Sequence, residues 1–175
     1  MIKVVLWDVD GTLLNFHAAE KVAIRTLFEE FGFGECTDDM LADYAVINRR
    51  HWQALERGEM TKPQVLVGRY REFFGKYGLD TSKSQDFNDR YQLALGDTIV
   101  FYDGAVETIK ALQAEVLQCA VTNGTKIAQD KKLTNSGLGE LFDNVFISDV
   151  IGVEKPNVGF FDAVWAEIGQ FEPSE

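Results

Sequence analysis

Two aspartates, Asp8 and Asp10, stand two residues apart after the apolar segment "IKVVLW" and directly before Gly11. Residues two apart on a strand point to the same face, so the two carboxylates would converge. Like charges that close are costly unless a cation or a proton lies between them. The pair could therefore bind a metal ion or carry out chemistry. The alternative is that both side chains bond the backbone of a turn, as Asp before Gly often does.

Three nucleotide- or metal-binding loops can be tested by their residue patterns. Asp-x-Asp-Gly also begins an EF-hand, but counted from Asp8 the position that requires glycine is Leu13, and the position that requires glutamate is Ala19. An EF-hand is therefore excluded. The phosphate loop G-x-x-x-x-G-K-[ST] is absent, and "GFGECT" at 32–37 lacks the third glycine of a dinucleotide fingerprint.

A second polar cluster, Thr122-Asn123-Gly124, ends the apolar run at 115–122. A strand that leads through a polar turn into a helix presents hydroxyl, amide and backbone N–H donors to an anion. Asn-Gly could instead form a hairpin turn, although the residues that follow it have a helical pattern. The cluster is a candidate phosphate site.

The third candidate is Lys155 in "GVEKPN", shortly after the apolar run at 144–148. The residue before a proline is held extended, so Lys155 is expected to stand off the helix that follows. A solvated surface lysine is the alternative. The position after a core strand favours a functional role.

The apolar runs at 2–7, 115–122 and 144–148 are predicted strands, and helical patterns follow Gly104, Thr125 and Asn157. Alternating strands and helices indicate an α/β fold with a Rossmann-like parallel sheet, formed by residues 1–15 and 98–175. In such sheets ligands bind at the carboxyl ends of the strands. The three candidate groups should therefore meet at one edge of the sheet.

Residues 16–97 show helical periodicity only. They predict an all-helical insert after the first strand, with "TKPQ" at 61–64 as a capping box. Each of its helices is followed by a glycine in the position of a C-terminal cap. The predicted helices are 18–31, 38–57, 61–77 and 83–95, and the glycines are Gly32, Gly58, Gly78 and Gly96.

The composition predicts a soluble globular protein, with 46% hydrophobic and 26% charged residues in 175. No apolar stretch approaches the ~20 residues of a membrane span, and the N-terminus is no signal peptide, so a cytoplasmic location is expected. The net charge of -11 disfavours nucleic acid polymers and anionic membranes, but not a small phosphorylated metabolite. Cys36 and Cys119 suggest neither a disulfide scaffold nor a zinc site.

With these motifs in this order, the chain resembles the haloacid dehalogenase superfamily of phosphohydrolases. Asp8-Val9-Asp10-Gly11-Thr12-Leu13 looks like its first motif, Thr122 its second and Lys155 its third. The resemblance implies that Asp8 is a nucleophile and Asp10 a general acid and base, that both hold Mg²⁺, and that residues 16–97 form a helical cap over the site. Asp10 also favours phosphate over halide chemistry. The implied phosphate-binding residues are Gly11, Thr122, Asn123, Gly124 and Lys155.

Residues 46–74 are similar to the cap of pyrimidine 5′-nucleotidases, which implies a nucleoside 5′-monophosphate as substrate. A sugar-phosphate or phosphoglycolate phosphatase is the alternative, and Trp52 and Tyr70 could simply be packed core. Arg49, Arg50 and His51 could reach substrate or face solvent. The likeness rests on Asn48, Trp52, Glu56, Gly58 and Arg69, with "TNG" at 122–124 and Gln129 beyond the cap.

The family's fourth motif, a strand followed by glycine and aspartates that complete the magnesium site, has no counterpart after Lys155. Asp149 and Glu154 are the nearest acidic residues, and a solvated role is expected for both. Without a fourth strand, residues 2–7 would form an apolar sheet edge, so we expect a truncated chain rather than a complete enzyme. A non-catalytic binding module or an inactive truncated hydrolase is the alternative of another class.

Overall fold

The computed structural model describes residues 2–169 and 171, so positions 1, 170 and 172–175 of the predicted core lie outside the described residues. The chain divides into two compact units. A core unit consists of Met1–Ala19 and Leu95–Glu175, and a helical unit consists of Glu20–Ala94. Each unit is described by itself below.

The core unit contains a three-stranded parallel sheet in the order β1-β2-β3, with β1 Val4–Trp7, β2 Leu117–Thr122 and β3 Asn144–Ile147. Trp7 lies opposite Ala120, and Thr122 lies opposite Ile147. The predicted α/β fold with a parallel sheet is confirmed. The register brings the carboxyl ends of all three strands to the same edge of the sheet.

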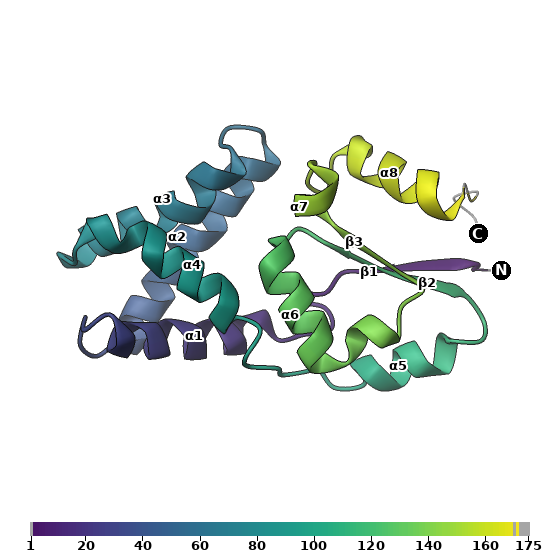
Figure 1. Cartoon of the computed structure of the whole chain (residues 1–175), viewed down its shortest axis with the longest axis horizontal. Helices are drawn as coiled ribbons and strands as arrows, with labels where there is room; N and C mark the ends of the chain where they lie inside the picture. Colours follow the sequence, from purple (N-terminus) through teal and green to yellow (C-terminus); the bar gives the residue numbers. More distant parts are fainter. Residues whose placement is uncertain (1, 170, 172–175) are drawn as a thin grey trace. The chain divides into compact units, whose positions relative to one another are not determined.

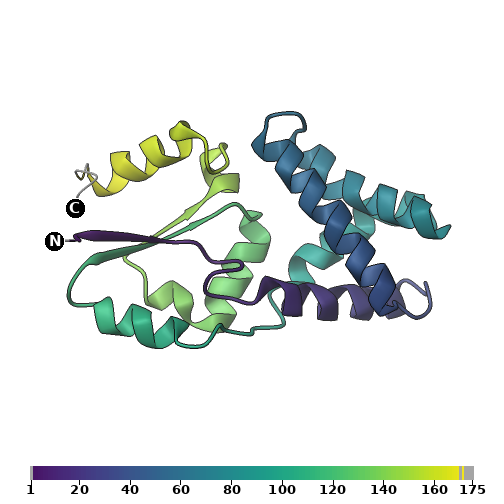
Figure 2. The same cartoon turned by 180° about the vertical axis from the view of Figure 1, so that it is seen from behind.

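Both faces of the sheet are covered, as Figure 1 shows and Figure 2 repeats from behind, with α5 Ala105–Leu112 and α6 Lys126–Ser136 on one side and α8 Val158–Ile168 on the other. The side chains of β2 alternate between the two faces of the sheet, which explains this layering. Ala120 packs with the first group of helices, whereas Cys119 and Val121 pack with Phe160 and Val164 of α8. A strand buried on both faces has a largely apolar sequence, and this pattern predicts β2.

The predicted starts of two core helices are confirmed by their N-caps. The Thr125 hydroxyl accepts a hydrogen bond from the amide of Ala128, and the Asn157 side chain accepts one from Gly159. Two short elements of the core unit were not predicted, namely the 3₁₀ turn η2 Leu138–Glu140 and the one-turn helix α7 Ser148–Ile151 directly after β3. Elements of three or four residues are too short to show a period.

The helical unit contains most of α1 Phe16–Glu30, then α2 Asp38–Glu56, α3 Lys62–Tyr77, the 3₁₀ turn η1 Thr81–Lys83 and α4 Ser84–Ala94. The prediction of Gln64 as a capping residue is confirmed, because the amide of Thr61 donates to Gln64 Oε1 over 2.8 Å. Gly32, Gly58 and Gly78 have φ of 69°, 71° and 66°, as left-handed C-terminal residues do.

Gly96 does not have this conformation, so its prediction as a left-handed cap is wrong. A Cβ atom at Gly96 would lie 2.6 Å from Cγ of Lys131. The side chain of Lys131 crosses the backbone here and forms an ion pair with Asp97. Glycine is therefore required at this position for space and not for a positive φ.

A buried polar network lies within the aromatic core of the helical unit. Arg69 is 1% exposed and donates to Oδ1 of Asn48 over 2.8 Å and to Oδ1 of Asn88 over 3.2 Å. Asn48 in turn donates to Glu20, which also accepts from the hydroxyl of Tyr91. The network thus connects a buried cation to a buried carboxylate through an amide.

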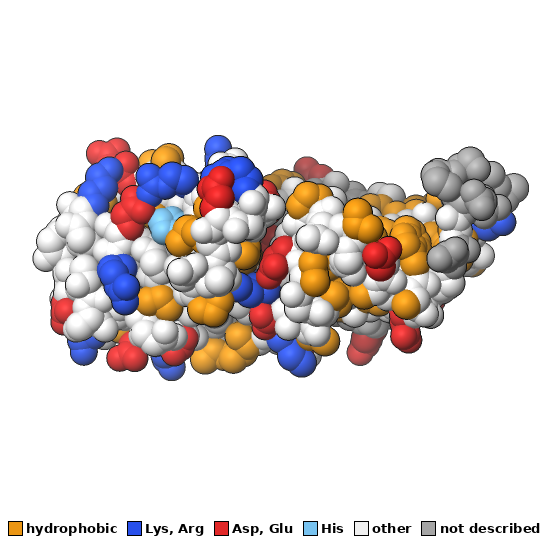
Figure 3. Space-filling view, turned by 90° about the horizontal axis from the view of Figure 1, so that it is seen from above, with side chains coloured by type: hydrophobic (Ala, Val, Ile, Leu, Met, Phe, Trp, Pro, Cys, Tyr) orange, Lys and Arg blue, Asp and Glu red, His pale blue; other side chains and the backbone are white. Residues whose placement is uncertain are grey.

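The surface carries charges of both signs, which Figure 3 shows interspersed over one face. None of the helices in residues 2–169 combines the length and the apolar composition that crossing a membrane requires. Both cysteines are buried and unpaired, and burial raises the pKa of Cys36 and of Cys119 to about 11. The thiols are therefore neutral packing groups at physiological pH.

Candidate active site

The turn after β1 presents the two predicted catalytic carboxylates on either side of a buried residue. Val9 is fully buried, and its carbonyl accepts from the amides of Leu13 and Leu14. This anchors the turn to the core, while Asp8 and Asp10 remain partly exposed. Gly11 has φ of 90°, which only glycine adopts readily, and its amide donates to the carbonyl of Leu14. That amide is engaged within the turn.

Asp8 forms an ion pair with Lys155, although 147 positions separate them in sequence. Lys155 Nζ lies 2.7 Å from Asp8 Oδ1 and 2.7 Å from the carbonyl oxygen of Val121. The other oxygen, Oδ2, accepts from the hydroxyl of Thr12 over 3.1 Å. The Asp8 side chain is 41% exposed and Lys155 only 18%, so the carboxylate faces solvent with its cation behind it.

Asn123 holds the backbone of Lys155 in place. Its Nδ2 donates to the Lys155 carbonyl over 2.8 Å, and its Oδ1 accepts from the Lys155 amide over 2.7 Å. The structure therefore brings Asn123, Lys155 and Asp8 together at the carboxyl edge of the sheet. It also gives Asn123 two partners that compete with a direct contact to phosphate.

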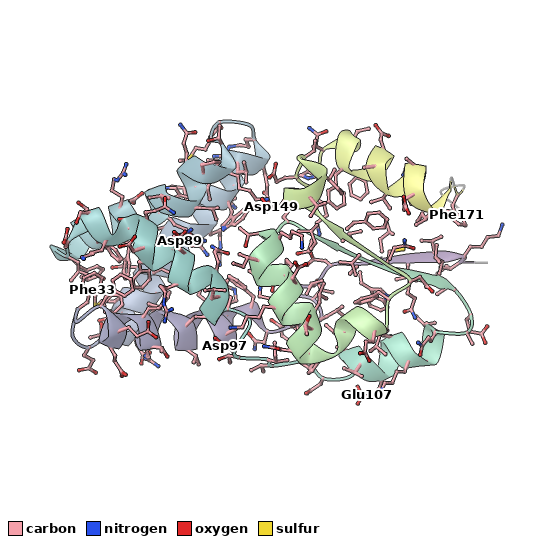
Figure 4. All side chains as sticks on the ribbon, in the orientation of Figure 1. Phe33, Asp89, Asp97, Glu107, Asp149 and Phe171 are labelled. Atoms are coloured by element: carbon pink, nitrogen blue, oxygen red, sulfur yellow. The ribbon has the colours of Figure 1, made fainter. Side chains whose placement is uncertain are left out.

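The other predicted phosphate-binding residues lie at the end of β2. Thr122 is its last residue and is 1% exposed, and Gly124 is half-buried ahead of the Thr125 N-cap. Asp149 of α7, labelled in Figure 4, accepts a hydrogen bond over 2.9 Å from the amide of Lys126, which lies in the first turn of α6. Asp149 is exposed, as expected for a solvated residue, and its hydrogen bond also helps to satisfy the N-terminus of α6 beside the Thr125 N-cap.

Two residues that contact Asp10 were not predicted to do so. Lys132 Nζ lies 2.7 Å from Oδ1 and 2.7 Å from Oδ2 of Asp10, and Gln129 Nε2 lies 2.7 Å from Oδ2. Lys132 is 3% exposed at its side chain, whereas Asp10 is 23% exposed. The signal in the sequence was the spacing, since Gln129 and Lys132 are three apart on the face of α6 that carries Leu133.

The resemblance implies two oxygen donors for magnesium, the carboxylate of Asp8 and the backbone carbonyl of Asp10. The bridge between Asp10 and Leu14 uses the carbonyl of Val9 and the amide of Gly11, so the Asp10 carbonyl takes no part in it. These donors match the preference of Mg²⁺ for hard oxygen ligands with several retained waters. Within residues 2–169 and 171, no cluster of three or more His, Cys, Asp or Glu side chains could hold a metal ion.

The helical-unit residues that carry the nucleotidase likeness have different environments. Asn48 and Arg69 belong to the buried network, which gives them a role in packing. His51 is 8% exposed, with Nδ1 3.0 Å from the carbonyl of Ile47, and Arg50 is exposed and paired with Glu72. Trp52 is half-buried and Glu56 is exposed. Hydrogen bonds to buried partners therefore account for the presence of Asn48 and Arg69 without a bound ligand.

Replacing Gly124 with alanine should disturb the contact between Gln129 and Asp10. A Cβ at Gly124 would lie 2.2 Å from Gln129 Nε2, and Gln129 is 1% exposed, so its side chain must be displaced. Overpacking of this kind costs about 1–3 kcal/mol, which thermal unfolding of the variant would measure. Gly139→Ala is the matched control, because its Cβ would make an ordinary contact of 3.5 Å. Equal midpoints for both variants would contradict the steric argument.

Comparison with known proteins identifies the family. The sequence profile of the haloacid dehalogenase-like hydrolases matches residues 2–175. The chain is 36% identical to the HAD-hydrolase YfnB of Bacillus subtilis over 97% of its length and 71% of that protein. It is 32% identical to the pyrimidine 5′-nucleotidase PynA of Streptococcus pneumoniae over 97% of its length and 71% of that protein. The pyrimidine 5′-nucleotidase YjjG of Escherichia coli is 26% identical over 94% of this chain and 71% of its own.

Solved structures agree with these relatives. The crystal structure of YfnB, described as bound to magnesium and as revealing interdomain movement, has a TM-score of 0.91 over 98% of this chain and 76% of that one. The L-2-haloacid dehalogenase of Xanthobacter autotrophicus, 22% identical, has a TM-score of 0.70 over 98% and 66% and shares the fold. The match to the family profile and the identity to YfnB place this chain in the haloacid dehalogenase-like hydrolase family.

Proposed function

We propose that this hydrolase cleaves phosphate monoesters with Mg²⁺ through an aspartyl-phosphate intermediate on Asp8. The observation that carries the proposal is the pair formed by Asp8 and Lys155, with Nζ 2.7 Å from Oδ1, beside the second carboxylate of Asp10. A nucleophilic carboxylate needs a cation that also neutralises charge on the phosphoryl group it attacks. Lys155 supplies this cation from behind a carboxylate that faces solvent.

The proposed reaction has two displacements. An oxygen of Asp8 attacks phosphorus, the bond from phosphorus to the ester oxygen breaks, and the carboxyl proton of Asp10 passes to that leaving oxygen. Water then attacks the same phosphorus while the Asp10 carboxylate takes its proton, and the bond to Asp8 breaks to release inorganic phosphate. One general acid contributes about 10²- to 10⁴-fold to such a reaction.

Charge stabilisation must supply most of the remaining acceleration, because phosphate ester hydrolysis in water is extremely slow. Each of the two carboxylates has its own ammonium group, Lys155 for Asp8 and Lys132 for Asp10. A phosphate dianion adds negative charge to a site that is otherwise balanced. Mg²⁺ bound by the Asp8 carboxylate and the Asp10 carbonyl would supply positive charge to the phosphoryl oxygens.

A dehalogenase is the competing activity within this fold. A halide leaves as an anion and needs no proton, so the reaction has no use for a second acid. Here Asp10 is held by three hydrogen bonds at the same strand end as Asp8. This arrangement supports the hydrolysis of an ester, whose alkoxide leaving group requires a proton.

We propose nucleoside 5′-monophosphates as the substrate class and the helical unit as a cap that determines specificity. The support comes from the relatives, since PynA and YjjG carry the name pyrimidine 5′-nucleotidase. The interdomain movement described for YfnB is what a cap that opens and closes would require. The predicted domain limits, 16–97 for the cap and 1–15 with 98–175 for the core, are part of the same proposal.

The test is release of inorganic phosphate from a panel of esters by the 175-residue chain and, where the gene continues, by the longer product. The panel contains nucleoside 5′-monophosphates with pyrimidine and purine bases, sugar phosphates, phosphoglycolate and a 2-haloacid as the dehalogenase control. We expect phosphate release that requires Mg²⁺, ends with EDTA and has its highest kcat/KM on pyrimidine nucleotides.

The outcomes separate the parts of the proposal. A preference for sugar phosphates or phosphoglycolate would overturn the nucleotide assignment and leave the phosphatase standing. Halide release without phosphate release would replace it with a dehalogenase. If neither form releases phosphate from any ester, the phosphatase proposal is wrong.

A further inference from the structure

Lys132 is a buried lysine whose ammonium group is placed on Asp10. Its side chain is 3% exposed, and Nζ contacts both carboxylate oxygens at 2.7 Å. The ring of Phe16 covers the same ammonium group, with its centroid 5.1 Å away. Burial of a lysine is costly without a partner of opposite charge, so this position depends on Asp10.

Gln129 approaches Asp10 from the same face of α6. Its Nε2 donates to Oδ2 over 2.7 Å, and the residue is 1% exposed. The other end of this amide, Oε1, is buried with no hydrogen-bond partner among the described residues. An unsatisfied buried acceptor costs free energy, so packing alone would not favour glutamine here. The contact with Asp10 is the feature that accounts for it.

Three hydrogen bonds on two oxygens leave the Asp10 carboxylate little freedom to rotate. Asp8 is held differently, by Lys155 from the loop after β3 and by Thr12 from its own turn. The two carboxylates therefore have separate cations from separate elements. Changing the support of Asp10 need not change the support of Asp8.

We propose that Lys132 and Gln129 are positioning residues that fix the orientation of the Asp10 carboxyl group toward the leaving oxygen of the substrate. Neither residue contacts the substrate in this assignment, and both act through Asp10. The inference rests on the proposed phosphatase function. It adds that the efficiency of Asp10 as an acid and base depends on the buried face of α6.

The choice of substrate distinguishes positioning from a general structural role. Alkyl phosphates such as nucleoside 5′-monophosphates release an alkoxide, which must be protonated as it leaves. p-Nitrophenyl phosphate releases a stable phenolate, which needs little help from an acid. A misplaced Asp10 should therefore slow the first substrate far more than the second, whereas a distorted site should slow both alike.

The experiment compares kcat and KM on uridine 5′-monophosphate and p-nitrophenyl phosphate for Lys132→Met, which keeps the length of the side chain. We expect kcat on the nucleotide to fall by about 100-fold, with KM little changed and a much smaller loss on the aryl ester. Gln129→Met should show the same pattern with a loss of about 10-fold. Lys131→Met is the matched control, because it removes an equal charge from the adjacent residue of α6. The ammonium group of Lys131 pairs with Asp97, whereas that of Lys132 pairs with Asp10.

Equal losses on both esters, or no loss, in Lys132→Met would overturn the inference. If thermal unfolding shows that Lys132→Met is not folded, the ratio of the two losses in Gln129→Met decides in its place. A wild-type protein that releases phosphate from no ester of the panel would defeat the proposed function itself. That result is distinct from the failure of the inference, which requires an active wild-type protein.

Discussion

Asp8→Asn is expected to lower kcat for phosphate release by at least about 10⁴-fold, as loss of a nucleophile does in other enzymes with covalent intermediates. Asparagine has the shape of aspartate, but its amide cannot form the acyl-phosphate bond on which the proposed reaction depends. The loss should appear in kcat for every ester, including p-nitrophenyl phosphate. This uniform loss is the opposite of the substrate-dependent loss expected for Lys132→Met.

The control for this variant is Asp130→Asn on α6. Asp130 is exposed and paired with Lys126 across one helical turn, so the same chemical change there should leave kcat unchanged. Thermal unfolding checks that Asp8→Asn is folded. We expect an intact fold, because Lys155 keeps its hydrogen bond to the carbonyl of Val121. If folded Asp8→Asn retains a tenth or more of the wild-type kcat, Asp8 is not the nucleophile.

Arg69→Met is expected to destabilise the protein more than any surface substitution. The guanidinium group is buried and donates to Asn48 and Asn88, and it lies over the rings of Tyr70 and Tyr91 at 4.9 and 5.1 Å. Burial raises the pKa of both tyrosines well above the ordinary value, so they are neutral partners at physiological pH. Without Arg69 the carboxylate of Glu20 loses the cation to which Asn48 connects it.

Removing one charge from such a network typically costs about 3–5 kcal/mol, because the groups left behind are buried and unpaired. For a chain of this length the midpoint of thermal unfolding should fall by roughly 10 °C, followed by circular dichroism. Arg50→Met is the matched control, since Arg50 is an exposed arginine of the same unit paired with Glu72. A midpoint for Arg69→Met equal to that of Arg50→Met would show that the network adds no stability.

The sequence predicted the elements of the core because their patterns have a single physical cause. Strands buried on two faces are mostly apolar, and β2 places Ala120 on one face and Cys119 and Val121 on the other. The glycines after three helices of the helical unit were informative because those positions need a positive φ. Gly96 was misinterpreted, since its requirement comes from the side chain of Lys131, which is distant in sequence.

The site was predicted in part for a comparable reason. Asp8 and Asp10 directly follow β1, and Lys155 lies in the connection that follows β3 and α7, so their order along the chain predicts a position at the carboxyl edge of the sheet. Lys132 lies in the second half of a helix, where a lysine is ordinarily solvated, and only the packing of α6 turns it inward. Asn123 was predicted to bind phosphate, but its partner is the Lys155 backbone, which no local pattern reveals.

The two hydrogen bonds between Asn123 and the backbone of Lys155 give this side chain the part of a peptide group. Like the main chain of a strand residue, a side-chain amide offers both a carbonyl acceptor and N–H donors. Asn123 directly follows β2, which ends at Thr122, and its side chain makes with the Lys155 backbone the pair of bonds that a strand makes with its main chain. These bonds fix the backbone of the loop that carries Lys155 to the end of β2, and Nζ of Lys155 donates to the carbonyl of Val121 in the same strand. The position of the ammonium group is therefore determined by the sheet rather than by the loop.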